Sequence, residues 1–130
     1  MHDPELVHIF TAPLEVSGLD YLITGSVACA VYGEPRMTHD IDIVLALSPR
    51  DAVLIEAAFP LDRFYYPPPE VIRMEAGRAQ RGHFKLIHHE TGFKADIYLK
   101  ANEPLHAWAM QHRRSVDLPG GRIALAPLST

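Results

Sequence analysis

The sequence predicts an α+β fold in which a short mixed β-sheet is flanked by helices. Segments that alternate apolar and polar residues, typical of half-buried strands, are separated by segments with helical apolar spacing. Two of the expected strands are joined by the short turn at residues 90–92, so part of the sheet is antiparallel. A chain of 130 residues suffices for one core, and we expect residues 1–130 to form a single domain.

In the first half of the chain, capping residues and prolines mark where the helices begin. Pro4 follows a capping Asp3, and Ser48 precedes Pro49 with Asp51 in the first turn. In chain order we expect a helix that begins at Pro4, is broken or restarted at Pro13 and ends at Gly18, a strand at 21–24, a helix at 27–32, a strand at 40–47 and a helix that is capped by Ser48 and continues to Phe59.

The second half adds a hairpin and a weaker pair of strands. We expect a rigid extended segment at 65–69, a helix at 70–76, an exposed basic loop at 77–82, strands at 84–89 and 93–99, a helix from Pro104 through Met110, and strands at 115–118 and 122–126 joined by Gly120 and Gly121. The chain ends soon after this strand, which leads us to expect a domain truncated at, or continuing beyond, its C-terminus.

Composition excludes several classes of protein. The single cysteine, Cys29, excludes an internal disulfide framework and favours the cytoplasm. The N-terminus lacks the features of a secretory signal and no apolar run spans a bilayer, so no membrane partner is expected. The net charge of −4 argues against a strongly basic nucleic-acid surface, and the local basic cluster at residues 73–85 is read as a solvated face.

The candidate active centre consists of three aspartates on expected strands. Alternation directs Asp40 and Asp42 to one face of their strand, where two close like charges repel each other unless a cation lies between them. Asp96, between Ala95 and Ile97 on a later strand, adds a third carboxylate. Such a set suits Mg²⁺, with one or two ions, and Mn²⁺ as a substitute. Solvent-facing aspartates on a half-buried strand are the alternative.

A small-residue turn precedes the aspartates. Gly25 and Ser26 end a strand and open a helix, where the glycine admits a phosphate and the helical N–H groups favour an anion. The lysine and spacing of a P-loop are missing. An ordinary strand–helix turn with a serine cap is the alternative.

Together these motifs resemble a known superfamily. Gly25-Ser26, the run at residues 33–44 (Gly-x-Pro-Arg-x-Thr-x-Asp-Ile-Asp-Ile-Val) and Ala95-Asp96-Ile97 resemble the nucleotidyltransferase superfamily, in which a Gly-Ser turn precedes an Asp-x-Asp strand and a third carboxylate follows. The run at 33–44 looks more specifically like small bacterial nucleotidyltransferases of the AbiEii toxin type. The resemblance spans roughly residues 21–99.

The resemblance implies a nucleotidyltransferase-like fold and a metal-dependent transfer of a nucleotidyl group from a nucleoside triphosphate such as ATP to a hydroxyl acceptor. Asp40, Asp42 and Asp96 would be the catalytic and metal-binding residues, and the nucleotide would be bound by Gly25, Ser26, Arg36 and Lys94. Lys94 and Tyr98 share the face of Asp96 by alternation. The acceptor stays open among RNA, protein and small molecules, and a toxin–antitoxin role with a cognate antitoxin is implied by analogy.

Other classes of site fit the sequence less well. The eight histidines lack zinc-ligand spacing, and His39 is expected to point away from the aspartates. Ser26 lacks a nucleophile elbow, and Cys29 is expected in the core. The remaining alternative is a non-catalytic nucleotide- or protein-binding module of the same fold. Because all three aspartates are retained, we favour catalysis.

Overall fold

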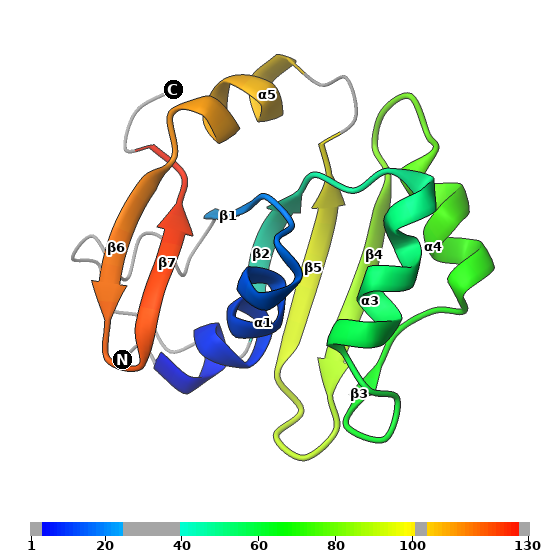
Figure 1. Ribbon diagram of the computed structural model, residues 1–130, viewed down its shortest axis with the longest axis horizontal. Helices are drawn as coiled ribbons and strands as arrows, with labels where there is room; N and C mark the ends of the chain where they lie inside the picture. The colour runs from blue at the N-terminus through cyan, green and yellow to red at the C-terminus, as the bar shows by residue number, and fades with distance from the viewer. Residues whose placement is uncertain (1–3, 25–39, 101–103, 128–130) are drawn as a thin grey trace.

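The computed structural model describes residues 4–24, 40–100 and 104–127, which form one mixed sheet with helices packed on it (Figure 1). The helices and strands, in chain order, are α1 (Pro4–Ser17), β1 (Tyr21–Thr24), β2 (Asp40–Leu45), a 3₁₀ turn (Pro49–Asp51), α3 (Ala52–Ala58), β3 (Phe64–Tyr65), α4 (Pro69–Ala76), β4 (His83–His88), β5 (Lys94–Leu99), α5 (Pro104–Gln111), β6 (Arg114–Leu118) and β7 (Gly121–Leu125).

The seven strands of the described residues lie in the order β3-β4-β5-β2-β1-β7-β6. The β2–β5 and β1–β7 pairs are parallel, and the other four pairs are antiparallel. β2 is therefore a central strand with β1 on one side and β5 on the other. The mixed α+β architecture predicted from the sequence is confirmed, and its short strand β3 is the one element that the sequence analysis did not predict.

One face of the sheet carries the main core. Ile41, Ile43 and Leu45 alternate along β2 and are buried against α1, α3 and α4, which lie together on this face in Figure 1. Phe10 of α1 and Ile55 of α3 have no exposed surface. Because successive strand residues point to opposite faces, burial of these side chains turns Asp40 and Asp42 to the other face.

The second face is partly covered as well. Ala109 and Met110 of α5 pack on Leu22 and Val44. Val44 follows Asp42 by two residues and lies on its face, so α5 covers the Leu45 end of this face, whereas Asp40 at the other end of β2 is exposed. Helices therefore lie on both faces of the sheet, and α5 buries the apolar Leu22 and Val44 on the face that also carries the aspartates.

α1 runs without a break through Pro13, contrary to the break expected there. Proline inside a helix removes one backbone hydrogen bond and costs about 3 kcal/mol. In α1 the fully buried Val7, Phe10 and Leu14 hold the helix on the sheet on both sides of the proline. This tertiary packing offsets the local penalty.

The helix start at Ser48 also differs in detail. The Ser48 hydroxyl does not cap a backbone N–H group but donates to Asp51 Oδ2 at 2.9 Å. The backbone closes first as a 3₁₀ turn, with Asp51 N donating to Ser48 O, and α3 follows. The helix was expected in the right place, with the wrong capping contact.

Within the described ranges, no helix is both long and apolar enough to cross a membrane.

Candidate active site

Asp42 and Asp96 lie side by side on the open face of the sheet. β2 and β5 pair in parallel with Asp42 and Asp96 as Cα partners, and neighbouring strands are about 4.8 Å apart. Both residues are half-buried, whereas Asp40, two residues earlier on the same face, is exposed and pairs with Lys94. The fold thus gathers on one face the three carboxylates that sequence analysis singled out.

The three carboxylates affect one another electrostatically. The pKa of Asp42 is raised above its ordinary value by burial, then by the charges of Asp96 and Asp40, with His83 acting in the opposite direction. The pKa of the Tyr98 hydroxyl is raised by burial and by Asp42 and Asp96. Negative charge is therefore concentrated at this point of the sheet, and a bound cation would relieve the repulsion.

Two residues of β4 contact Asp96 and were not singled out as site residues by the sequence analysis. His83 Nε2 lies 3.3 Å from Asp96 Oδ1, and Lys85 Nζ lies 3.6 Å from the same oxygen. Lys85 is the direct antiparallel partner of Asp96, and His83 is the partner of Tyr98. Counting back from the turn expected at 90–92 pairs Leu86, not Lys85, with Asp96. The observed hairpin pairs Ile87 with Lys94, a register shifted by one residue, and this shift places Lys85 opposite Asp96.

Lys94 and Tyr98 flank Asp96 on β5. Both are exposed and share its face by alternation, as expected. The Tyr98 ring contacts the His83 ring, with centroids 5.1 Å apart and planes at 45°. The open face therefore carries acidic, basic and aromatic side chains within a few residues of each other.

Several predicted residues lie outside the described part of the chain. These are Gly25, Ser26, Arg36 and His39, together with Cys29 and the helix expected at 27–32. Thr24, the last described residue of β1, is the Cα partner of Asp42. β1 therefore ends beside the carboxylates, at the position where the sequence continues into Gly25.

The carboxylates fit a hard divalent cation in their donor chemistry. Mg²⁺ takes oxygen ligands and is commonly held by one or two carboxylates together with substrate phosphates. Over residues 4–24, 40–100 and 104–127, no three acidic, histidine or cysteine side chains form a closed metal-binding group. The fit rests on the neighbouring pair Asp42 and Asp96, which leaves room for ligands from a substrate.

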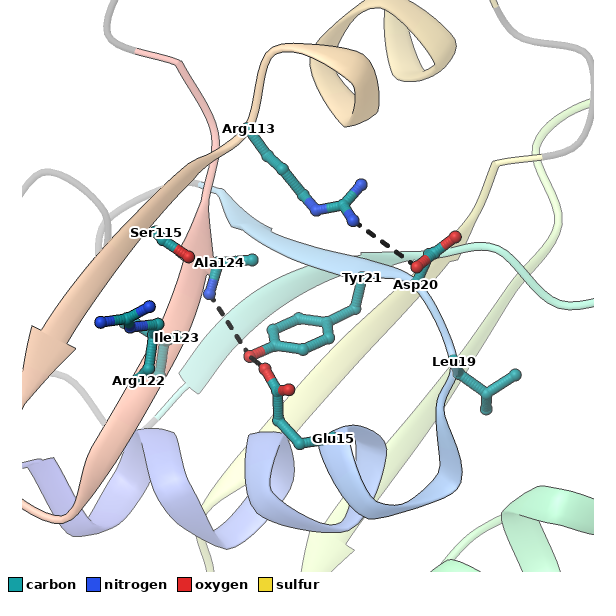
Figure 2. Close-up of a pocket in the computed structure, with 9 residues that line it drawn as sticks. All are labelled: Glu15, Leu19, Asp20, Tyr21, Arg113, Ser115, Arg122, Ile123 and Ala124. Carbon is teal, nitrogen blue, oxygen red and sulfur yellow. Dashed lines mark hydrogen bonds and ion pairs between the residues drawn. The ribbon is translucent and has the colours of Figure 1, made fainter.

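A separate cavity of about 210 Å³ lies near the start of β1, away from the carboxylates (Figure 2). The Tyr21 hydroxyl donates to Glu15 Oε2 at 2.6 Å and accepts from Ala124 N at 3.3 Å, while Arg113 Nη2 lies 3.5 Å from Asp20 Oδ1. Tyr21 pairs with Leu45, at the end of β2 opposite Asp40. These mutual pairings tie α1, β1 and β7 together and indicate a structural role.

Comparisons with known proteins support the fold. No protein-family model and no curated protein sequence matches the chain. Among solved structures, the chain is similar to a proposed nucleotidyltransferase from Thermotoga maritima, with a TM-score of 0.63, 20% sequence identity, and coverage of 98% of this chain and 81% of that one. The chain has a nucleotidyltransferase-like fold. At this level of identity the likeness establishes the fold alone, and activity has to be argued from the site.

Proposed function

We propose that this protein is a metal-dependent nucleotidyltransferase that moves a nucleotidyl group from a nucleoside triphosphate to a hydroxyl acceptor. The observation that carries the proposal is the in-register pair Asp42 and Asp96 on the open face of this fold. Asp40 adds a third negative charge on that face, and raises the pKa of Asp42 together with Asp96. The similarity to the Thermotoga maritima protein supports the same kind of reaction.

Asp40, Asp42 and Asp96 are the residues that would hold one or two Mg²⁺ ions, or Mn²⁺ in their place. Bound there, the cation would neutralise phosphate charge and the charge that develops during displacement. The acidic face needs such a cation before it can accept a triphosphate, since three carboxylates and a polyphosphate repel each other.

The chain's own residues would bind and orient the two substrates. Lys94, exposed next to the carboxylates, would contact the phosphates, as would Gly25, Ser26 and Arg36, which the resemblance assigns to the nucleotide. The acceptor oxygen forms a bond to the α-phosphorus, the bond from that phosphorus to the β-phosphate oxygen breaks, and pyrophosphate leaves. The acceptor proton would pass to the Asp96 carboxylate, which is half-buried and reachable from the open face.

The biological setting is part of the proposal. RNA, a protein side chain and a small molecule are the acceptor classes in view, and the resemblance to AbiEii-type toxins suggests a cytoplasmic toxin–antitoxin pair with a cognate antitoxin.

One observation favours a second candidate, a nucleotide- or protein-binding module without turnover. Lys85 and His83 both contact Asp96 Oδ1 and offset part of the charge that would otherwise attract a metal. In such a module the β4 residues would substitute for the cation. The two candidates differ in whether pyrophosphate is released.

The test is pyrophosphate release from each of the four ribonucleoside triphosphates, with Mg²⁺ and a mixture of total RNA and protein as acceptor. The proposal predicts turnover by the intact protein and a loss of about 100-fold or more in Asp42→Asn, because one metal ligand is removed. Asp62→Asn, at an exposed position two residues before the edge strand β3, is the matched control. Full activity of Asp42→Asn would reject the site, and nucleotide binding without pyrophosphate release would favour the binding module.

A further inference from the structure

The contacts to Asp96 are distributed unevenly between its two carboxylate oxygens. His83 Nε2 at 3.3 Å and Lys85 Nζ at 3.6 Å both contact Oδ1. Within the described ranges, no residue makes a hydrogen bond or ion pair to Oδ2. A carboxylate oxygen can only accept, so the contact with His83 requires its proton on Nε2. Among the described residues, the contacts from β4 therefore all fall on one oxygen of this carboxylate.

β4 is held firmly enough to make these contacts specific. Glu75, at the end of α4, accepts a hydrogen bond from His83 N at 3.0 Å through Oε1 and one from Arg78 Nε at 3.0 Å through Oε2. Gly82 packs so closely on α4 that a Cβ there would lie 2.4 Å from Glu75 O, and its own carbonyl accepts from Leu99 N at 2.9 Å. The first residues of β4 are thus fixed to α4 and to β5.

The Tyr98 ring also contacts the imidazole. Its centroid is 5.1 Å from that of His83, and Tyr98 is the Cα partner of His83. His83 is consequently in contact with two side chains of β5, the Tyr98 ring and the Asp96 carboxylate. A side chain confined in this way has fewer rotamers available than its exposed position alone would allow.

We propose that His83 and Lys85 are positioning residues that hold Asp96 by Oδ1 and so direct Oδ2 to the substrates. The proposal rests on the proposed function, in which Asp96 ligates the cation and receives the acceptor proton. Residues that orient a ligating carboxylate through hydrogen bonds commonly change metal affinity or activity by about 10- to 100-fold when they are removed. A misplacement of Oδ2 by a fraction of an ångström acts on the chemical step more than on nucleotide binding.

Each residue is replaced in two ways, once by a side chain that loses the contact with Asp96 and once by a side chain that keeps it. His83→Phe keeps a ring against Tyr98 but removes the donor, whereas His83→Gln keeps an N–H donor at a similar reach. Lys85→Met removes the cation and Lys85→Arg retains it. His89→Phe, at an exposed position just beyond β4, is the matched control for introducing phenylalanine.

Three quantities are measured on each intact variant: kcat and KM with the nucleoside triphosphate, the affinity for Mn²⁺ alone by electron paramagnetic resonance, and the side-chain carboxyl ¹³C signal of Asp96 in metal-free protein. We expect His83→Phe and Lys85→Met to lower kcat by about 10- to 100-fold with little change in KM and to shift the Asp96 signal, and we expect His83→Phe to lower the Mn²⁺ affinity as well. His83→Gln and Lys85→Arg should recover most of each loss, and His89→Phe should match the unmodified protein.

Two results would overturn the positioning role. One is a His83→Phe variant in which all three quantities equal those of the unmodified protein. The other is a loss of kcat in His83→Gln as large as in His83→Phe with the Asp96 signal unmoved, because the imidazole would then act on the substrate directly. The carboxyl signal is read without metal or substrate, so it tests the positioning role even if the unmodified protein releases no pyrophosphate, an outcome that would count against the proposed function instead.

Discussion

Asp42 and Asp96 are Cα partners in the parallel β2–β5 pair, so their carboxylates share one face of the sheet although they are far apart in the sequence. This pairing raises the pKa of Asp42, because burial and the neighbouring carboxylates both disfavour its ionised form. Carboxylates that destabilise the folded protein when no ligand is bound are typical of functional sites, where residues are retained for ligand binding at the expense of stability.

The first prediction concerns the effect of the ionised Asp42 carboxylate on the free energy of unfolding. Folding raises the pKa of Asp42 above its ordinary 3.8, so the ionised carboxylate destabilises the folded protein at neutral pH, and this cost disappears as the pH falls below 3.8. Asp42→Asn should therefore raise the free energy of unfolding near pH 7 in the presence of a chelator. The gain should vanish near pH 3. Denaturant unfolding at both pH values measures it.

Asp62→Asn, which changes an exposed aspartate outside the site, serves as the control and should alter the free energy of unfolding little at either pH. An Asp42→Asn variant that is less stable than the unmodified protein at neutral pH would mean that the carboxylate makes a net favourable contact, against the repulsion described here.

The second prediction concerns the hydrogen bonds of Tyr21 shown in Figure 2. Tyr21→Phe removes the bonds to Glu15 and Ala124 and should lower the free energy of unfolding by about 1–2 kcal/mol at neutral pH. Burial and the Glu15 hydrogen bond raise the pKa of the Tyr21 hydroxyl far above its ordinary 10. The stability that the hydroxyl contributes is therefore present below pH 10 and is lost as the pH rises beyond it.

The difference between Tyr21→Phe and the unmodified protein should accordingly shrink above pH 10, as measured by denaturant unfolding. Tyr65→Phe, in which the tyrosine is 51% exposed, is the control and should be nearly neutral. Equal stabilities of Tyr21→Phe and the unmodified protein at pH 7 would rule out a structural role for the hydroxyl.

The third prediction uses two glycines near the end of α4. A Cβ on Gly82 would lie 2.4 Å from Glu75 O, so Gly82→Ala should cost about 1–3 kcal/mol by displacing the start of β4. At Gly77 the nearest atom would be 3.5 Å away, and φ is −87°, so Gly77→Ala should be neutral or stabilising by up to about 1 kcal/mol. Thermal unfolding of the two variants compares them directly, and a tolerated Gly82→Ala would contradict the tight packing of β4 on α4.

Local patterns predicted most of the elements. Alternation located β2 and β5 within two residues, and the turn at 90–92 located the β4–β5 hairpin. Both signals are contained in short segments, where the period of apolar residues and the turn residues agree. The aspartate face could be predicted for the same reason, because it follows from alternation alone.

Long-range packing decided what the sequence did not predict. The helix at Pro13 continues because Phe10 and Leu14 are buried on either side of it, and α5 lies on the aspartate face because Leu22 and Val44 require cover there. Local propensity carries no information on such partners. The contacts of Lys85 and His83 with Asp96 depend on a strand register that differs by one residue from the register implied by a three-residue turn at 90–92.

The most direct test of the central claim is calorimetric titration of each nucleoside triphosphate, with and without Mg²⁺, into the intact protein and into the double variant Asp40→Asn/Asp42→Asn. We predict Mg²⁺-dependent binding of at least one nucleotide to the intact protein and its loss in the double variant, which would also identify the donor base. Binding of equal strength in the two proteins, or binding indifferent to Mg²⁺, would contradict a nucleotidyltransferase site built on these aspartates.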